Sequence, residues 1–409
     1  MKDLISSFYK NNRIKLQGSC SPRLLVVRAS DAIQKSADQA YPFYQNSDFW
    51  YLTGLNFPGL ILVIAPNEHF LIVPTLSKYK QIFDGQIDRE ELISKSAVDT
   101  IYNQTEGYFK LKQLLLQYKE VGLPSPYLRL REFQILNAPY FVGIKRLLSR
   151  LANHKLKYIS INRELAQMRM IKQPIELEFI QKAIDITISG MELVLANLKQ
   201  DSAYSKPKVL ADLSYSFLSR GSSGHAFDPI IASGSEAVTI HNSDRQHLIA
   251  SDQLLTLDIG AEYNHYSADL TRTFIPSKAL SRQLEVFRAV QDVQTEAIKL
   301  IRPGLLVSEL EKEVQMMIGL HLKHLKLIKE PSPNLIRRYY PHACSHSLGL
   351  DTHDLADYSQ PLAENMVITI EPGIYIPEEG IGVRLEDDIL ITKNANSNLS
   401  KALPTELVI

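Results

Sequence analysis

Short apolar runs and helical stretches alternate along the first third of the chain. Residues 24–27 and 60–65 are continuous apolar runs of the length of buried strands, whereas residues 109–118 repeat apolar side chains at helical spacing. Another strand-like run follows at 158–161. Strands interleaved with helices are typical of an α/β domain. The pattern therefore predicts an N-terminal α/β domain.

A strong helix start separates this domain from the rest of the chain. Pro174 is followed by two acidic residues within one turn, and apolar residues then recur at helical spacing. Proline and acids in the first turn mark the beginning of a helix. We place the domain boundary near Lys172, which gives an N-terminal domain at 1–172 and a C-terminal domain at 173–409.

The C-terminal part alternates helices with antiparallel strand pairs. Helical periodicity predicts helices near 208–218, 281–301 and 307–328, and strands near 229–232 and 253–274. A strand-rich block follows at the end. Because helices and antiparallel strands are both abundant, the sequence predicts an α+β fold class.

Composition limits the classes of function. A chain of 409 residues exceeds the usual size of one domain. Lys plus Arg and Asp plus Glu number 45 each, so no net field attracts nucleic acid or an anionic membrane. The N-terminus is polar where a signal peptide needs an apolar core, and no run approaches a membrane span. Cys20 and Cys344 are too few for a disulfide framework. These features favour a cytoplasmic enzyme.

Two carboxylates lie on a predicted hairpin. Residues 253–274 read as two strands joined by a turn around Tyr263 and Asn264. Reflection about that turn places Asp258 nearly opposite Asp269, and the alternation of a strand directs both to one face. Two carboxylates among apolar neighbours repel each other and are poorly solvated. A divalent metal between them would remove both problems.

The C-terminal block supplies further ligands of the right kind. Glu371 ends the apolar strand VITIEPG, Glu386 lies in VRLEDDILI, and His346 sits among small residues in HACSHSLG. Each of these residues alone is more often structural, but together with the hairpin acids they suit two divalent ions such as Mn(II), Co(II) or Zn(II). Arg384 falls on the face of Glu386, where it could orient a ligand carboxylate. No phosphate-binding loop, HExxH or GxSxG motif competes with this interpretation.

Several neighbouring residues have simpler interpretations. Asp387 and Asp388 could serve as spare ligands, but we interpret them as strand-end charges, with Asp387 on the face opposite Glu386. We interpret His321 and His324 as part of a solvated helix face. Cys344 has two interpretations: a small residue that lets its loop pass close to the site, or a thiol held partly as thiolate beside a dication.

Five segments together resemble a known family. They are IIASGSEAVTIHN, LDIGAEYNHYSADLTRTF, HSLGLDTHD, ITIEPGIYI and GIGVRLEDDILIT, and they resemble the pita-bread metallopeptidases of the aminopeptidase P and prolidase branch. The stretch SADQAYPFYQNSDFWYLTGLNFPG resembles the N-terminal domain of aminopeptidase P. The resemblance covers essentially the whole chain. It implies a pita-bread catalytic domain preceded by a smaller α/β domain.

The resemblance implies a role for each ligand residue. Asp258 would bind one metal, His346 and Glu371 the other, and Asp269 and Glu386 would bridge both. Two divalent ions per chain are implied, with Mn(II) as the expected metal. They would activate a water that attacks the scissile carbonyl, with Glu371 as the proton acceptor.

Five other residues match family positions around the metals. His241 and His353 match substrate-facing histidines, and His342 matches a histidine on the proline side of the pocket. Arg384 and Tyr375 match partners of the first aspartate. One departure is that the stretch from His353 to Glu371 contains no arginine, which bears on the leaving-group side of the pocket.

The implied activity is removal of an N-terminal residue that precedes proline. A peptide with proline second would be the substrate, and relatives of this kind assemble as homodimers or homotetramers. The alternatives are a prolidase, restricted to Xaa-Pro dipeptides, and a non-catalytic pita-bread module that binds peptides. A methionine aminopeptidase would leave the large N-terminal domain unexplained.

Overall fold

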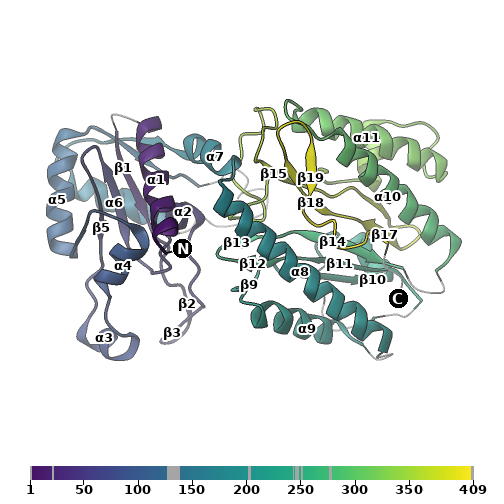
Figure 1. Cartoon of the computed structure of the whole chain (residues 1–409), viewed down its shortest axis with the longest axis horizontal. Coiled ribbons are helices and arrows are strands. Elements are labelled where there is room, and N and C mark those ends of the chain that lie inside the picture. Colours follow the sequence, from purple (N-terminus) through teal and green to yellow (C-terminus); the bar gives the residue numbers. More distant parts are fainter. Residues whose placement is uncertain are drawn as a thin grey trace. The chain divides into compact units, whose positions relative to one another are not determined.

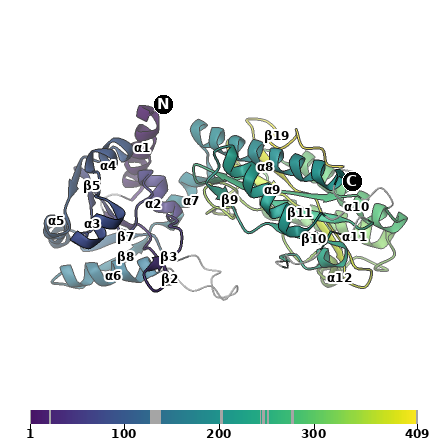
Figure 2. The same ribbon diagram turned by 90° about the horizontal axis from the view of Figure 1, so that it is seen from below.

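The chain divides into two compact units. The computed structural model describes residues 2–20, 23–126, 139–200, 204–242, 244, 248–249, 252–275 and 279–406. The units are Met1–Met168 and Arg169–Ile409, drawn in two views in Figure 1 and Figure 2. The division falls near the end of helix α7 (Asn162–Met170), a few residues before the boundary that we expect at Lys172.

The first unit is an α/β domain on a six-stranded mixed sheet, with a separate two-stranded hairpin at residues 34–40. Within the described residues the strand order is β6-β5-β4-β1-β7-β8. β1 pairs antiparallel with β4 and parallel with β7, and β4 pairs antiparallel with β5. At the two edges of the sheet, β6 pairs parallel with β5 and β8 pairs parallel with β7. The strands are β1 (Leu24–Arg28), β2 (Gln34–Ser36), β3 (Gln39–Ala40), β4 (Ile61–Ala65), β5 (Glu68–Ile72), β6 (Thr100–Tyr102), β7 (Glu120–Leu123) and β8 (Lys157–Ser160).

Helices surround this sheet and complete its core. The predicted helix at 109–118 is the later part of α5, which begins earlier because the Asn103 side chain caps its first turn. The predicted strands at 24–27 and 60–65 are β1 and β4, whose aliphatic residues are buried. The helices are α1 (Lys2–Cys20), α2 (Ser47–Thr53), α3 (Lys78–Asp84), α4 (Arg89–Ser96), α5 (Gln104–Gln117), α6 (Pro139–Leu151) and α7.

The second unit packs two pairs of helices against short antiparallel strands. α8 packs on α9 and on β12 and β13, whereas α10 packs on α11 and on β15, β16 and β17 (Figure 1). The helices are α8 (Pro174–Gln200), α9 (Lys206–Ser219), α10 (Ser281–Leu300), α11 (Val307–His324) and α12 (Pro333–Tyr339), with a 3-10 turn at Gly234–Val238. The strands are β9 (Gly224–His225), β10 (Ile230–Ser233), β11 (Leu255–Ile259), β12 (Ala261–Tyr263), β13 (Tyr266–Ser267), β14 (Leu270–Phe274), β15 (Val367–Ile370), β16 (Gly373–Ile376), β17 (Ile381–Arg384), β18 (Asp387–Ile391) and β19 (Asn396–Asn398).

The predicted helices of this unit are present with one changed end. The helix predicted at 281–301 is α10, and the one predicted at 307–328 is α11, which stops at His324. The reason is that Leu325 caps the helix and Lys326 adopts a left-handed conformation with φ of 62°. Among the described residues, no helix is long and apolar enough to span a membrane.

The hairpin that carries the two aspartates turns one residue later than predicted. Asn264 and His265 form the turn, both with positive φ (48° and 64°), as a two-residue type I′ turn requires. The register therefore pairs Asp258 with Thr271. Asp269 lies two residues from Thr271 along the chain and is diagonal to Asp258, not directly opposite it.

Candidate metal and catalytic site

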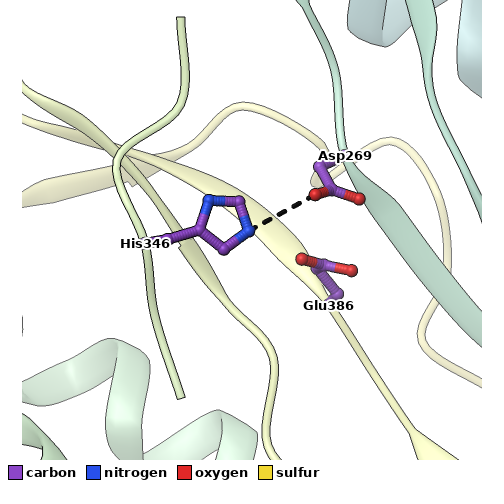
Figure 3. Close-up of side chains that lie close together, drawn as sticks. All are labelled: Asp269, His346 and Glu386. Atoms are coloured by element: carbon purple, nitrogen blue, oxygen red, sulfur yellow. Dashed lines mark ion pairs between the residues drawn. The ribbon is translucent and has the colours of Figure 1, made fainter. Parts of the chain in front are cut away.

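Asp269, His346 and Glu386 form the centre of the site. They come from three segments: the residue before β14, the loop after α12 and the connection between β17 and β18 (Figure 3). Each residue offers one possible metal-ligand atom, and these three atoms all lie within 4.8 Å of one another. His346 Nε2 is 3.4 Å from Asp269 Oδ2. All three side chains are buried.

The other two predicted ligands flank this group. Glu371 follows β15 directly and places Oε1 3.5 Å from His346 Nε2. Asp258 on β11 has one carboxylate oxygen, Oδ1, that is buried without a hydrogen-bond partner. A buried carboxylate oxygen without a partner is unfavourable, and a bound cation would satisfy it. The residues present therefore fit a site for divalent cations.

Burial, with repulsion between neighbouring carboxylates, raises the pKa of Asp269, Glu371 and Glu386. Burial is the larger cause for Asp269 and Glu386, whose pKa values lie well above the ordinary range, and the neighbouring carboxylates add to it. Burial also raises the pKa of Glu371 to about 8, although Arg384 opposes this shift. Without a cation the group therefore holds protons, and dications would replace them.

His346 is in the state that a metal ligand needs. Its Nδ1 lies 3.1 Å from the Ser347 carbonyl oxygen, and donation to that oxygen leaves the Nε2 lone pair directed at the carboxylates. Burial, followed by the effect of His353, lowers the pKa of His346 to about 3. The imidazole is thus neutral at physiological pH.

Backbone pairing with β15 fixes the loop that carries His346. The His346 N–H donates to Thr369 Oγ1 at 3.1 Å, and the Thr369 N–H donates to the His346 carbonyl at 2.9 Å. The Glu371 N–H donates to the Cys344 carbonyl at 2.8 Å. These bonds hold His346 and Glu371 side by side although they are distant in sequence.

Thr271 links the hairpin to Glu386. The Glu386 N–H donates to the Thr271 carbonyl at 3.0 Å, and Thr271 Oγ1 donates to Glu386 Oε2 at 2.6 Å. Thr271 Oγ1 also accepts a hydrogen bond from Arg384 Nε at 3.3 Å. One side chain of β14 thus orients two residues of the C-terminal strands.

A chain of hydrogen bonds runs outward from Asp258. Arg384 Nη2 donates to Asp258 Oδ2 at 2.6 Å, and Arg384 Nη1 donates to the Tyr375 hydroxyl at 2.8 Å. That hydroxyl lies 2.8 Å from His342 Nε2, while His342 Nδ1 lies 2.8 Å from the Ala343 carbonyl oxygen. Arg384 therefore contacts the first aspartate directly, whereas Tyr375 acts through Arg384.

Two of the three predicted substrate-side histidines lie next to predicted ligands: His353 beside His346, and His342 beside Glu371. The His353 ring is exposed, and its centroid lies 4.1 Å from that of His346 with the planes at 35°. His342 Nδ1 is 3.6 Å from Glu371 Oε2. His241 is exposed. The pKa of His342 is lowered to about 3 by burial, then by Arg384 and Arg337, with a smaller contribution from His241.

Asp387 and Asp388 lie at the start of β18, as we expected, but they are not solvated. Both are buried. Asp387 Oδ1 pairs with Arg272 Nη2 at 2.7 Å, and Asp388 Oδ2 accepts a hydrogen bond from the Asp269 backbone N–H at 3.2 Å. Their position within an apolar run, VRLEDDILI, was the available signal, because acids at such positions are buried and need partners.

Cys344 fits the packing interpretation. It is fully buried within the core cluster of the second unit. Burial raises the pKa of its thiol well above the ordinary value, and Glu311 adds to the shift. In the metal-free protein this environment favours the protonated thiol. Of the two helix histidines, His324 is exposed as expected and His321 is half-buried.

Comparison with known proteins identifies both units. The profile of metallopeptidase family M24 matches residues 178–393, and that of the aminopeptidase P N-terminal domain matches residues 9–121. The chain is 29% identical to human Xaa-Pro aminopeptidase 3, over 95% of this chain and 80% of that protein. It is also 29% identical to Escherichia coli Xaa-Pro aminopeptidase, over 92% and 90%.

A solved structure agrees with these matches. Aminopeptidase P from E. coli with the inhibitor Pro-Leu superposes with a TM-score of 0.87 at 27% identity, over 98% of this chain and 96% of that one. The resemblance to the pita-bread metallopeptidases and the predicted fold class are thereby confirmed. The M24 match spans more than half of the chain and contains the site, so the chain belongs to metallopeptidase family M24.

Proposed function

We propose that this protein is a two-metal aminopeptidase that hydrolyses the bond between an N-terminal residue and a following proline. The observation that carries the proposal is the grouping of Asp269, His346 and Glu386, with Asp258 and Glu371 beside them, in a chain of family M24. The names of the relatives support the substrate class.

The five ligand-type residues would hold two divalent ions, with Mn(II) as our expected metal. Asp258 would bind one ion, His346 and Glu371 the other, and Asp269 and Glu386 would bridge both. The ions would supply Lewis acidity, which lowers the pKa of water and polarises the scissile carbonyl. The orphaned Asp258 Oδ1 supports this assignment.

The protein residues would move the protons and stabilise the developing charge. Glu371 is the proposed proton acceptor, because its carboxylate borders the centre. His353 and His241 would donate hydrogen bonds to the tetrahedral oxyanion or pass a proton to the proline nitrogen. Both imidazoles are exposed and are therefore accessible to a substrate.

Selection for proline would rest on the shape of the pocket. A proline imide lacks an N–H and its ring is stiff, so a pocket formed around that ring selects it sterically. We assign His342 to this side. Its hydrogen bond to Tyr375, which Arg384 also binds, holds the imidazole in one orientation.

The deciding experiment compares three peptides with the Mn(II)-loaded protein: Xaa-Pro-Yaa, Xaa-Ala-Yaa and the dipeptide Xaa-Pro. Release of the first residue from Xaa-Pro-Yaa, with Xaa-Ala-Yaa cut much more slowly, supports the proposal. Cleavage of the dipeptide alone identifies a prolidase. Metal binding without cleavage of any peptide indicates a non-catalytic module. A cytoplasmic location and a homodimeric or homotetrameric assembly remain predictions.

A further inference from the structure

A buried group of charges lies behind the loop that carries the two neighbouring histidines. We name residues 346–354 the histidine loop, and Arg169, Lys172 and Asp354 the Asp354 clamp. All of these residues belong to the second unit. The side chains of the clamp are each about 1% exposed. No step of the proposed reaction uses them directly.

The Asp354 carboxylate pairs with both basic side chains of the clamp, Arg169 and Lys172. Arg169 Nη2 donates to Asp354 Oδ1, and Lys172 Nζ donates to Oδ2 at 3.3 Å. Arg169 Nη2 also donates to Asp351 Oδ2 at 2.7 Å, farther out on the same loop. The Lys172 backbone N–H donates to the Asn365 carbonyl at 2.8 Å, and this bond fixes the backbone that carries the lysine side chain.

The loop backbone is shaped around this carboxylate. A Cβ at Gly349 would lie 2.2 Å from Asp354 Oδ2 and 3.2 Å from Lys172 Cε, so only glycine allows this approach. The Asp354 N–H donates to the Ser347 carbonyl at 2.8 Å, and the Ser267 N–H donates to the Gly349 carbonyl at 2.8 Å. Backbone hydrogen bonds therefore join the two ends of the histidine loop and tie Gly349 to the metal-site hairpin, while the Asp354 carboxylate packs against Gly349 and holds the end of the loop to Arg169 and Lys172.

Stability alone does not explain why these charges are buried, so we ask whether they position a neighbouring residue. Removing charged groups from water is expensive, and well-packed apolar side chains stabilise a core at least as well. His353 directly precedes Asp354, yet its own ring is exposed. The backbone at Asp354 is thus a rigid anchor adjacent in sequence to a side chain that stacks beside His346.

We propose that the Asp354 clamp is a positioning device that holds the His353 ring beside His346, an inference that rests on the proposed function of His353. Asp354 acts through His353 and touches neither substrate nor metal. Misplacement of a reacting group by about 1 Å can cost about 100-fold in rate. A loosened clamp should therefore lower kcat with little effect on KM.

A double-mutant cycle separates positioning from general stability. Asp354→Asn, His353→Ala and the double variant are loaded with Mn(II) and assayed on Xaa-Pro-Yaa. We expect Asp354→Asn to lower kcat about tenfold or more in the wild-type background and less than about twofold in the His353→Ala background. An equal loss in both backgrounds would overturn the proposal. If Asp354→Asn does not fold, Lys172→Met is carried through the same cycle with the same criterion.

The matched control is Asp212→Asn. Asp212 accepts hydrogen bonds from Asn197 Nδ2 at 2.7 Å and from the Tyr204 hydroxyl, between α8 and α9. This variant also loses a charged acceptor and some stability, but kcat should stay at the wild-type value. A fall in kcat for the control as large as that for Asp354→Asn would show a nonspecific effect and overturn the proposal.

A readout without catalysis keeps this inference separate from the proposed function. NMR of metal-free, histidine-labelled protein follows the ring resonances of His346 and His353, assigned with the His353→Ala variant. Asp354→Asn should shift the His353 resonance, because its ring moves relative to His346, while the resonance of His225 stays. An unmoved His353 resonance refutes the clamp. Absence of peptide cleavage by the wild-type holoenzyme would refute the proposed function instead.

Discussion

Arg384 places a buried guanidinium 2.6 Å from Asp258, with its Nη2 facing Oδ2. Asp258 therefore keeps one oxygen for the arginine, while Oδ1 has no protein partner and is available to a cation. The arginine also balances part of the negative charge of the carboxylates. The pair sets the orientation of Asp258, the proposed non-bridging ligand of its ion.

The first prediction concerns this pair. Arg384→Gln removes the charge and leaves the Asp258 carboxylate free to rotate, so we expect metal affinity or activity to fall about 10–100-fold. Titration with Mn(II) monitored by calorimetry and by rate measures both. Arg282→Gln, which breaks the ion pair with Glu379 away from the carboxylates, is the control and should bind metal normally. Unchanged Mn(II) affinity and rate in Arg384→Gln would contradict the orienting role.

A second prediction tests the bridging assignment. Asp269→Asn replaces a proposed bridging carboxylate with a neutral amide, so both metal occupancy and activity should be lost together. Elemental analysis after equilibration with Mn(II), combined with a peptide assay, measures the two quantities. Asp252→Asn changes an exposed acid that precedes β11 and should retain both. Two bound ions and normal activity in Asp269→Asn would rule out the ligand assignment.

A third prediction separates His353 from the metal ligands. His353→Ala should lower kcat about 10²–10⁴-fold with normal metal content, since an acid–base group is removed and the carboxylates remain. His324→Ala, an exposed histidine of α11, is the control for loss of an imidazole. Loss of metal from His353→Ala would make it a ligand, and a nearly unchanged rate would make it structural.

The fourth prediction concerns pH and the metal-free protein. The folded pKa of Glu371, about 8, exceeds its ordinary value of 4.5, mainly because of burial. A raised carboxyl pKa contributes stability that is complete below the unfolded pKa and lost as pH rises through the folded one. The lowered pKa values of His342 and His346 act in the opposite direction below their ordinary value of 6.5, so the free energy of unfolding of the metal-free protein should fall between about pH 6.5 and pH 8. Denaturant titrations across this range measure it.

Two comparisons sharpen that test. Glu371→Gln should flatten the decline, because an amide does not titrate. Mn(II) should stabilise the wild type more at pH 8 than at pH 5, since cations compete with protons for the same oxygens. A stability of the metal-free protein that rises steadily from about pH 6.5 to pH 8 would contradict the raised pKa of Glu371.

Features that depend on the local residue pattern, such as the face of a strand on which a side chain lies, could be predicted from the sequence. Period-2 alternation placed Asp258 and Asp269 on one face, and this holds although the turn at Asn264 and His265 shifts the register. This shift of one residue could not be predicted, because the turn depends on two consecutive left-handed backbone conformations. The residue types around Tyr263 do not specify which two residues adopt them.

Ion-pair partners that are distant in sequence could not be predicted. Arg169 lies 182 and 185 residues before Asp351 and Asp354, so no spacing rule connects them. Asp387 was misinterpreted for the same reason, because its partner Arg272 lies on another strand 115 residues earlier. Which charges are buried depends on packing between elements, and one sequence does not contain that information in local form.

The separation of the site residues along the chain bears on the order in which the protein folds. Asp258 and Arg384 are 126 residues apart, and contacts of such range form late because closing a long loop costs entropy. During synthesis the hairpin with Asp258 and Asp269 emerges before any of the residues that neutralise or orient it. The carboxylates must therefore remain hydrated until the C-terminal strands arrive, and burial of the site is one of the last events on the way to the native state.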